Sequence, residues 1–239
     1  MIIWLASYPK SGNTFVRSLL ASYFFTKDGN FNFDSLKFIG QFPDFKFFEE
    51  ANIELTHDKE IFKNYLKVQE TINKRDKNTV RILKTHSTMH DVGGYKFTDL
   101  KNTLGVIYIV RDPRQVVRSY ANHSTITLED AKKRILEIRT IGGPTDPLNK
   151  TVIHTGSWSS NYNSWKEFKK KDKYLLVRYE DLINDTEKTF LNILKFIAHL
   201  GRVKFTYDKE KFENTIKTTR FENMQKLEAK GNFVESKKD

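Results

Sequence analysis

The sequence predicts an α/β fold, a three-layer sandwich in which helices cover both faces of a central, mainly parallel sheet. Short runs of apolar, β-branched and aromatic residues recur along the 239 residues, and stretches with helical periodicity lie between them. A continuous apolar run of this length is typical of a strand buried on both faces, and strands that alternate with helices form parallel sheets. The composition agrees, because 38% hydrophobic and 30% charged residues can build a sizeable core with a polar surface.

The strands of this sheet are expected at four places, residues 2–6, 80–83, 106–110 and 174–177. One helix should begin near Gly12, and another should follow Asn184 and stop before Gly201. A third should begin at Pro113, with Asp112 as its cap, because proline suits the first helical turn and aspartate suits the cap. No repeat, low-complexity tract or linker interrupts the pattern, so we expect one domain over residues 1–239.

The charge balance points to an anionic ligand or partner. Forty-one Lys and Arg residues against 30 Asp and Glu residues give a net charge of +11. This charge is spread along the chain rather than gathered with aromatic residues, which argues against nucleic acid as the partner. The densest run, residues 166–173, is expected to be a solvent-exposed face at the end of a helix.

Two absences from the sequence limit the function classes further. The chain has no cysteine, which excludes disulfides, cysteine-based metal sites and thiol catalysis, and fits a reducing compartment. No apolar stretch approaches the ~18 residues that cross a membrane, and no signal-peptide pattern is present. We therefore expect a cytoplasmic protein without a membrane span.

Candidate site residues follow the predicted strands, since ligands of parallel sheets bind at the carboxyl ends of strands. After the first strand, Ser-Tyr-Pro-Lys-Ser-Gly-Asn-Thr-Phe (7–15) forms a glycine-containing turn into a helix. Such a turn aims backbone N–H groups and the helix dipole at one spot, which favours a phosphate, and Lys10 adds a positive charge there. It is not a Walker A loop, because the lysine precedes the glycine.

The other three strand ends carry further candidates. Lys84-Thr85-His86 follows the second strand, and Lys84 and His86, two residues apart, should point the same way. A neutral imidazole is suited to act as a general base, although a lone histidine can equally have a structural role. Arg111 precedes the predicted third helix and is either a second anion site or a surface salt bridge. Arg-Tyr-Glu-Asp-Leu (178–182) places an aromatic ring at the same edge.

In this order and spacing, the segments resemble the sulfotransferases that use 3′-phosphoadenosine 5′-phosphosulfate (PAPS). Tyr-Pro-Lys-Ser-Gly-Asn-Thr-Phe resembles the family's 5′-phosphosulfate loop, and Arg111 with Ser119, eight positions later, resembles its 3′-phosphate motif. Lys84-Thr85-His86 resembles the lysine and catalytic histidine of the cytosolic branch, and residues 178–182 and 218–224 resemble later family segments. The resemblance runs from Met1 to about Met224 and implies the P-loop-NTPase-like sulfotransferase fold.

The resemblance also implies a reaction and a role for each residue. A sulfuryl group would move from PAPS to the hydroxyl or amine of a small-molecule, lipid or glycan acceptor, leaving adenosine 3′,5′-bisphosphate (PAP). The implied catalytic residues are His86 as general base, Lys10 at the leaving phosphate and Lys84 on the transferring group. The implied cofactor-binding residues are Lys10, Ser11, Gly12, Asn13 and Thr14 for the 5′-phosphate, Arg111 and Ser119 for the 3′-phosphate, and Phe15, Tyr179, Thr219 and Phe221 for the adenine. No metal is expected, because a sulfuryl group carries less negative charge than a phosphoryl group and no metal-ligand spacing is present.

The sequence departs from the family pattern at two places. Phe15 stands where many members have tryptophan, and the late Arg-Lys-Gly-type loop at the 3′-phosphate is not found before Asp239, where Lys237-Lys238 does not resemble it. Two other functions stay open: a P-loop nucleotide kinase that needs Mg²⁺ and ATP, and a non-catalytic protein that binds a nucleotide or another anion.

The acceptor and the oligomeric state are not specified by the sequence. Residues 24–48 hold nine of the 19 phenylalanines, which either pack in the core or line an acceptor pocket. Trp158 and Tyr162, one helical turn apart, and the loop at Gly142-Gly143-Pro144 are further candidates for the acceptor site.

Overall fold

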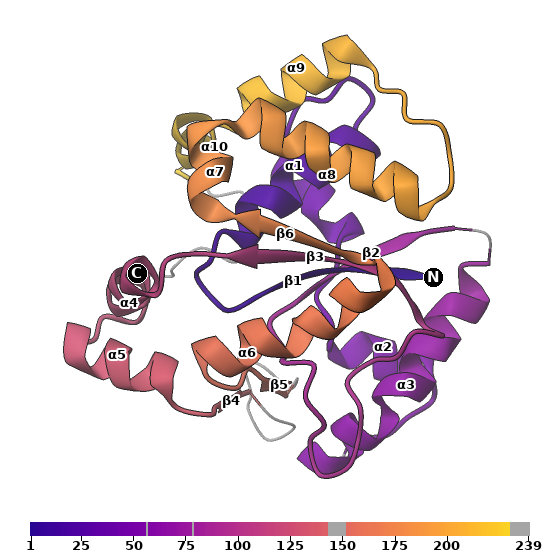
Figure 1. Cartoon of the computed structure of the whole chain (residues 1–239), viewed down its shortest axis with the longest axis vertical. Coiled ribbons are helices and arrows are strands. Elements are labelled where there is room, and N and C mark those ends of the chain that lie inside the picture. Colours follow the sequence, from indigo (N-terminus) through magenta and orange to yellow (C-terminus); the bar gives the residue numbers. More distant parts are fainter. Residues whose placement is uncertain (56, 78, 143–151, 230–239) are drawn as a thin grey trace.

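Four parallel strands form the central sheet in the order β2-β1-β3-β6 (Figure 1). The structure is a computed structural model that describes residues 1–55, 57–77, 79–142 and 152–229. The strands are β1 (Ile2–Ser7), β2 (Arg81–Thr85), β3 (Thr103–Val110) and β6 (Tyr174–Arg178). Each of the four predicted strands is confirmed to within about three residues at its ends, and the predicted parallel α/β sheet is confirmed.

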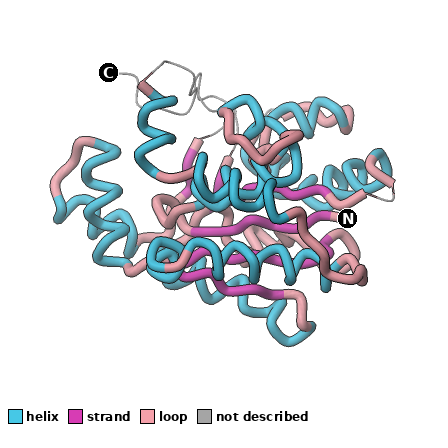
Figure 2. Tube along the Cα trace, turned by 90° about the horizontal axis from the view of Figure 1, so that it is seen from above, coloured by secondary structure: helices cyan, strands magenta, loops and turns pink. Residues whose placement is uncertain are grey.

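One layer of helices covers the upper face of the sheet in Figure 1. It consists of α1 (Asn13–Phe25), the 3₁₀ helix η1 (Phe33–Phe38), α7 (Tyr179–Asn184), α8 (Thr186–Leu200), α9 (Lys209–Thr218) and α10 (Phe221–Glu228). Seen from above, the strands lie side by side beneath these helices (Figure 2). The helices predicted after Gly12 and after Asn184 are therefore confirmed as α1 and α8.

A second layer covers the lower face, and two helices lie beyond the carboxyl ends of the strands (Figure 1). The lower layer holds α2 (Phe45–Glu50), α3 (Asp58–Arg75), α6 (Trp158–Ser164) and the 3₁₀ helix η2 (Trp165–Lys171). Beyond the strands lie α4 (Pro113–Ser124) and α5 (Leu128–Leu136), followed by the short antiparallel pair β4 (Thr140–Ile141) and β5 (Ile153–His154). Asp112 caps α4 as predicted, accepting a hydrogen bond from the backbone N–H of Arg114 at 2.9 Å.

Burial on both faces explains why the strands are apolar throughout. Along β1, Ile3 and Leu5 belong to the cluster under α1 and α8, whereas Ile2, Trp4 and Ala6 belong to the cluster above α3 and η2. All five side chains are fully buried. Alternate residues of a strand point to opposite faces, so a run without polar positions is needed when both faces are covered.

Most of the phenylalanine-rich segment belongs to these clusters. Phe31, Phe42, Phe47 and Phe48 are buried, while Phe24, Phe25 and Phe38 are partly exposed. Core packing therefore accounts for the buried rings. Likewise, Trp165 and Phe168 of η2 are buried while its lysines are exposed, which confirms that the lysine run is a solvated face.

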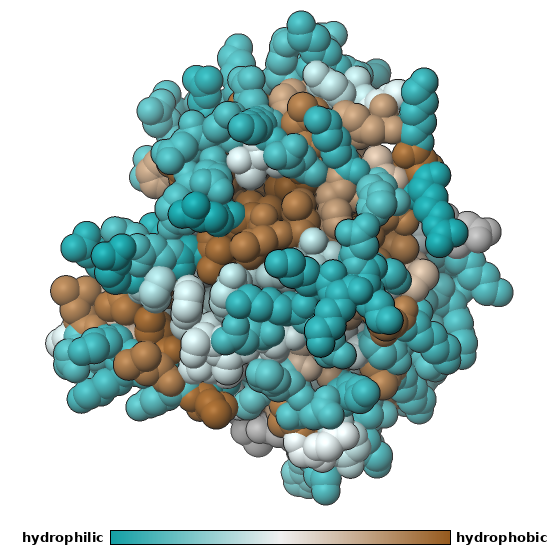
Figure 3. All heavy atoms as spheres, in the orientation of Figure 1, coloured by the Kyte–Doolittle hydropathy of each residue, from teal (hydrophilic) through white to brown (hydrophobic). Residues whose placement is uncertain are grey.

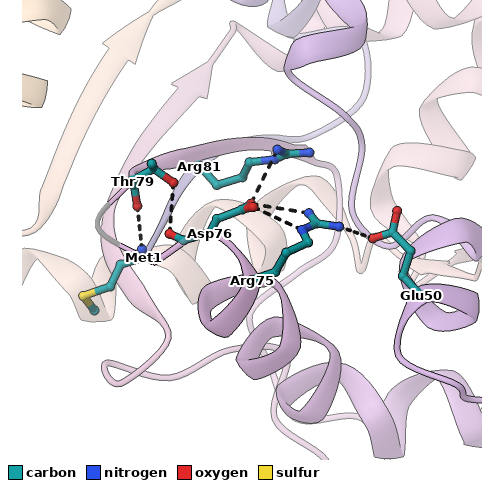
Figure 4. A network of polar contacts seen from close by, with 6 residues as sticks. All are labelled: Met1, Glu50, Arg75, Asp76, Thr79 and Arg81. Carbon is teal, nitrogen blue, oxygen red and sulfur yellow. Dashed lines mark hydrogen bonds and ion pairs between the residues drawn. The ribbon is translucent and has the colours of Figure 1, made fainter.

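A network of polar contacts lies at the N-terminal end of β2, opposite the carboxyl ends of the strands (Figure 4). The carboxylate of Asp76 accepts a hydrogen bond from Arg75 Nε at 3.1 Å and lies 3.5 Å from Arg81 Nη1, and Arg75 also reaches Glu50. These contacts connect the end of α3 to β2. Because the arginines are about two-fifths exposed, the ion pairs contribute little to stability.

In the part of the chain that the structure describes, no helix combines the length and apolar character needed to cross a membrane.

Candidate functional site

The loop between β1 and α1 has an unusual backbone. Lys10 and Gly12 both adopt left-handed conformations, with φ of 66° and 96°. For Lys10 this conformation costs about 1–3 kcal/mol, and such strain is concentrated at functional sites. Gly12 is the N-cap of α1, and no side chain caps that helix end. The loop therefore presents the N-terminal N–H groups of α1, a ready site for an anion.

Gly12 is required here for a second reason, which is the ring of Tyr179. A Cβ atom built on Gly12 would lie 2.4 Å from Cδ2 and 2.8 Å from Cε2 of that ring. Tyr179 begins α7, directly after β6, so the loop after β1 packs against the residue after β6 without space for a side chain.

Arg111 joins the ends of three strands. It follows β3, its Nη1 donates a hydrogen bond to the carbonyl of Lys10 at 3.2 Å, and its guanidinium carbon lies 4.3 Å from the centre of the Tyr179 ring. A guanidinium over an aromatic face is a cation–π contact that fixes the orientation of the planar group. The structure thus brings together four of the predicted residues, Lys10, Gly12, Arg111 and Tyr179. It does so between β1 and β3, where the strand order reverses and α/β sheets bind ligands.

His86 lies beside the last residue of β1. Its Nδ1 is 2.9 Å from the carbonyl oxygen and 3.2 Å from the hydroxyl oxygen of Ser7. A carbonyl oxygen only accepts hydrogen bonds, so this contact assigns a proton to Nδ1, and in the neutral ring the lone pair is then on Nε2. Asn13 of α1 donates to the same Ser7 hydroxyl at 3.1 Å and to the carbonyl of Leu5 at 3.0 Å. The histidine is therefore tied to the strand and helix that form the anion-binding loop.

Lys84 is buried within β2, two residues before His86. It pairs with Leu5 of β1, and on the other side its N–H and carbonyl bond to the carbonyl of Gly40 at 2.9 Å and the N–H of Phe42 at 2.8 Å. Its backbone is thus held from both sides, which gives the side chain a fixed origin at the strand end.

Among the residues that the structure describes, two buried donors at the predicted phosphate-binding positions have no hydrogen-bond partner. They are the hydroxyl of the fully buried Ser11 and Nε of Arg111. Buried polar atoms are nearly always paired, so each such donor calls for an explanation. Both residues were predicted to bind the phosphates of the cofactor, and an anionic group would supply the missing acceptors.

The remaining predicted residues differ in exposure. Asn13 is buried, Thr14 and Ser119 are half-buried, and Phe15 is half-buried against the core cluster under α1. Thr219 is fully buried, and its hydroxyl donates to the carbonyl of Thr215 at 2.7 Å.

Phe221, at the start of α10, is 71% exposed. The roles given to these residues and to Tyr179 stay predictions, as do the catalytic roles of His86, Lys10 and Lys84. Gly143, Pro144 and Lys237–Asp239 lie outside the described residues.

Sequence reasoning gave no role of their own to several residues around the site, among them Ser7 and Tyr8 of the candidate turn, and it did not indicate Asn161. The sequence held part of the signal for Ser7, because Ser7 and His86 each follow a predicted strand of one parallel sheet; the register that makes them neighbours, with Ala6 paired to Thr85, comes from the structure. Asn161 bonds to the carbonyl of His86 at 3.0 Å from a helix far along the chain, and no local pattern indicated it.

The region beyond the strands offers aromatic and apolar surface next to this site. Tyr8 is buried with Trp158 packed beside it, and the Trp158 ring is stacked on that of Tyr162 at 5.9 Å. Leu136 at the end of α5 and Ile138 after it are 66% and 73% exposed. Apolar surface is visible over α5 in Figure 3.

Comparisons with known proteins give one family for nearly the whole chain. The model of the family described as "Sulfotransferase domain" matches residues 2–238. Sulfotransferase 2A6 of Rattus norvegicus is 30% identical over 119 residues, which are 49% of this chain and 39% of that protein. Sulfotransferase 2B1 of Homo sapiens is 31% identical over 101 residues, which are 41% of this chain and 26% of that protein. The matches thus span about two-fifths of these relatives or less.

Solved structures show the same fold. Retinol dehydratase in a complex with retinol and PAP is 16% identical, with a TM-score of 0.58, covering 95% of this chain and 67% of that one. Mouse sulfotransferase SULT7A1 complexed with PAP is 18% identical, with a TM-score of 0.52, covering 94% of this chain and 65% of that one. The predicted P-loop-like architecture is therefore confirmed.

Proposed function

Because this chain belongs to the sulfotransferase family, we propose that it transfers the sulfuryl group of PAPS to the hydroxyl or amine of an acceptor. The observation that carries the proposal is the convergence at one sheet edge of an uncapped helix N-terminus, an oriented arginine and a histidine whose lone pair is on Nε2. The two unpartnered donors, on Ser11 and Arg111, support an anionic ligand at this place.

Each part of the site has a task in the proposed transfer. The acceptor oxygen forms a bond to sulfur, the bond from sulfur to the bridging phosphate oxygen breaks, and its electron pair stays on the phosphate of PAP. His86 takes the acceptor proton at Nε2. Lys10 stabilises the negative charge that grows on the bridging oxygen, and Lys84 holds the oxygens of the transferring group.

The chain's own groups also hold the nucleotide in this proposal. The N–H groups of residues 11–14 bind the 5′-phosphate at the start of α1, together with Lys10. Arg111 and Ser119 bind the 3′-phosphate, which distinguishes PAPS from ATP. The adenine is enclosed by the aromatic rings of Phe15, Tyr179 and Phe221 and by Thr219.

The acceptor is proposed to be a small molecule, lipid or glycan. Retinol dehydratase has been crystallised with retinol and with androsterone, which are apolar molecules. This chain exposes the apolar side chains of Leu136 and Ile138, which follow Ile135 of the buried cluster around Tyr8. We also propose that the protein is cytoplasmic, that it acts without a metal, and that residues 1–239 form one domain.

Calorimetric titration with PAP, with AMP as the control and no metal added, tests the cofactor. We expect tight binding of PAP and weak binding of AMP, unchanged by EDTA. Equal binding of the two nucleotides would contradict the 3′-phosphate site, and a need for Mg²⁺ with ATP would favour a kinase.

Two substitutions separate the proposed roles. Lys10→Ala should weaken PAP binding about 10- to 100-fold, since a charge-assisted hydrogen bond contributes about 1.5–3 kcal/mol. His86→Ala should abolish turnover while PAP binding stays near the wild-type value, because the base contacts the acceptor and not the nucleotide. Loss of PAP binding in His86→Ala would instead indicate a structural histidine.

A further inference from the structure

The segment that follows β2 is held by residues from a distant part of the chain. Strand pairing of β2 ends at Thr85, yet each of residues 86–89 makes a hydrogen bond to the segment 154–165. The bonds are Asn161 Nδ2 to the carbonyl of His86 (3.0 Å), Trp165 Nε1 to the carbonyl of Ser87 (3.1 Å), Thr88 N–H to the carbonyl of His154 (2.8 Å) and Met89 N–H to Ser164 Oγ (2.9 Å). These bonds take the place of a strand ladder.

Among these bonds, the one from Asn161 is made to His86 itself. Its side chain is fully buried, and its amide nitrogen donates to the carbonyls of His86 (3.0 Å) and Thr155 (2.8 Å). Its amide oxygen accepts a hydrogen bond from the hydroxyl of Tyr108, on the central strand β3, at 2.7 Å. With three partners in three separate segments of the chain, the amide has one orientation, so the position of the His86 carbonyl is fixed relative to the sheet.

We propose that Asn161 is a positioning residue for the base of the reaction: by holding the His86 main chain, it keeps Nδ1–H on the carbonyl of Ser7. The catalytic role of this contact rests on the proposed function, whereas the effect of Asn161 on the position of His86 does not depend on it.

The consequence of losing this bond follows from the chemistry of imidazole. Without the Asn161 bond, the carbonyl of His86 is no longer held, whereas its neighbours Thr85 and Ser87 still are, and the Nδ1–H contact with Ser7 at 2.9 Å is weakened. A neutral imidazole in water prefers its proton on Nε2, so the ring would lose the lone pair that accepts the acceptor proton. Small misplacements of reacting groups cost up to ~100-fold in rate.

The test compares Asn161→Ala with the matched control Tyr108→Phe. Both variants break the same buried network, but Tyr108→Phe removes only one hydroxyl and leaves the bond from Asn161 to His86 in place. Nitrogen-15 NMR of histidine-labelled protein, with His86→Gln to assign the signal, reports which ring nitrogen of His86 carries the proton. Titration with PAP is measured on every variant.

We expect the His86 signals to change from the Nδ1–H form toward the Nε2–H form in Asn161→Ala and to stay unchanged in Tyr108→Phe. PAP affinity should stay within about threefold of wild type in both, and kcat should fall 10- to 100-fold only in Asn161→Ala. If Asn161→Ala does not fold, Asn161→Ser, whose hydroxyl is too short to reach the His86 carbonyl, is measured in its place.

Unchanged His86 signals in the Asn161 variant, or equal changes in Tyr108→Phe, would overturn the proposal, the latter because it would show a general loosening of the core. Failure of the wild-type protein to bind PAP would count against the proposed function and would leave the NMR comparison intact, so the two ideas fail separately.

Discussion

Gly12→Ala is the substitution that best tests how the site is assembled. The added methyl group would lie 2.4 Å and 2.8 Å from two carbons of the Tyr179 ring, which is closer than non-bonded carbon atoms approach each other. The ring must therefore move, and with it the guanidinium of Arg111, which lies 4.3 Å from the ring centre. In addition, an L-residue at φ of 96° is strained by about 1–2 kcal/mol.

The magnitudes follow from these two effects. Backbone strain of ~1–2 kcal/mol should lower the Tm by about 2–8 °C in a chain of this size. Displacement of Arg111 should remove a charge-assisted hydrogen bond to the 3′-phosphate, worth about 1.5–3 kcal/mol, so PAP affinity should fall by a factor of about 10 to 150. Calorimetric titration with PAP and thermal unfolding measure the two effects independently.

Gly94→Ala is the matched control. Gly94 has a similar φ of 85°, and a Cβ built on it has nothing within 4 Å. It should lose similar stability and keep wild-type affinity for PAP. Wild-type affinity in Gly12→Ala would refute the reasoning, because the contact with Tyr179 would then have no part in arranging the site. Equal loss in both variants would assign the effect to stability alone.

Two further predictions concern the borders of the site. Hydrogen bonds from Arg114 lower the pKa of Asp112 from 3.8 to about 2, so Arg114→Ala should raise it toward 3.8; NMR titration of the carboxyl measures this. Because the pKa of Asp112 is lower in the folded state, the contact stabilises the protein above pH 3.8, and this stabilisation is lost as the pH falls toward 2. The free energies of unfolding of the wild type and the variant should therefore differ less at pH 2 than at pH 5. Phe221→Ala should weaken PAP binding by removing an exposed ring from the adenine. Thr219→Val should leave PAP binding unchanged, because valine keeps the shape of the side chain and the lost hydroxyl is bonded to the carbonyl of Thr215. The opposite ranking in a PAP titration would contradict this account.

The order of strands and helices could be predicted because its causes are local. Apolar runs without alternation, such as Ile2–Ala6, are typical of strands covered on both faces, and Asp112-Pro113 is a start signal for a helix whatever the rest of the fold does. Parallel strands place their carboxyl ends at one edge, so the sequence alone assigns the residues after the strands to one site.

The phenylalanines between residues 24 and 48 show where local reasoning stops. Their spacing is compatible with a core and with an acceptor pocket, and burial decides for each ring separately: Phe42 and Phe48 are fully buried, whereas Phe38 is 44% exposed. Which ring faces the sheet depends on how η1 and α2 pack, a property that the segment does not encode alone.

The sequence by itself determined the fold class, the family and the residues that gather at the carboxyl edge of the sheet, because each rests on short local patterns and on their order along the chain. Only the tertiary structure decided how those residues are oriented. The Nδ1 proton of His86 is assigned by Ser7, its main chain is held by Asn161, and the guanidinium of Arg111 is oriented by Tyr179. These partners are 68 to 79 positions apart in the chain, and hydrogen bonds and ring contacts at such separations arise only once packing has brought the elements together.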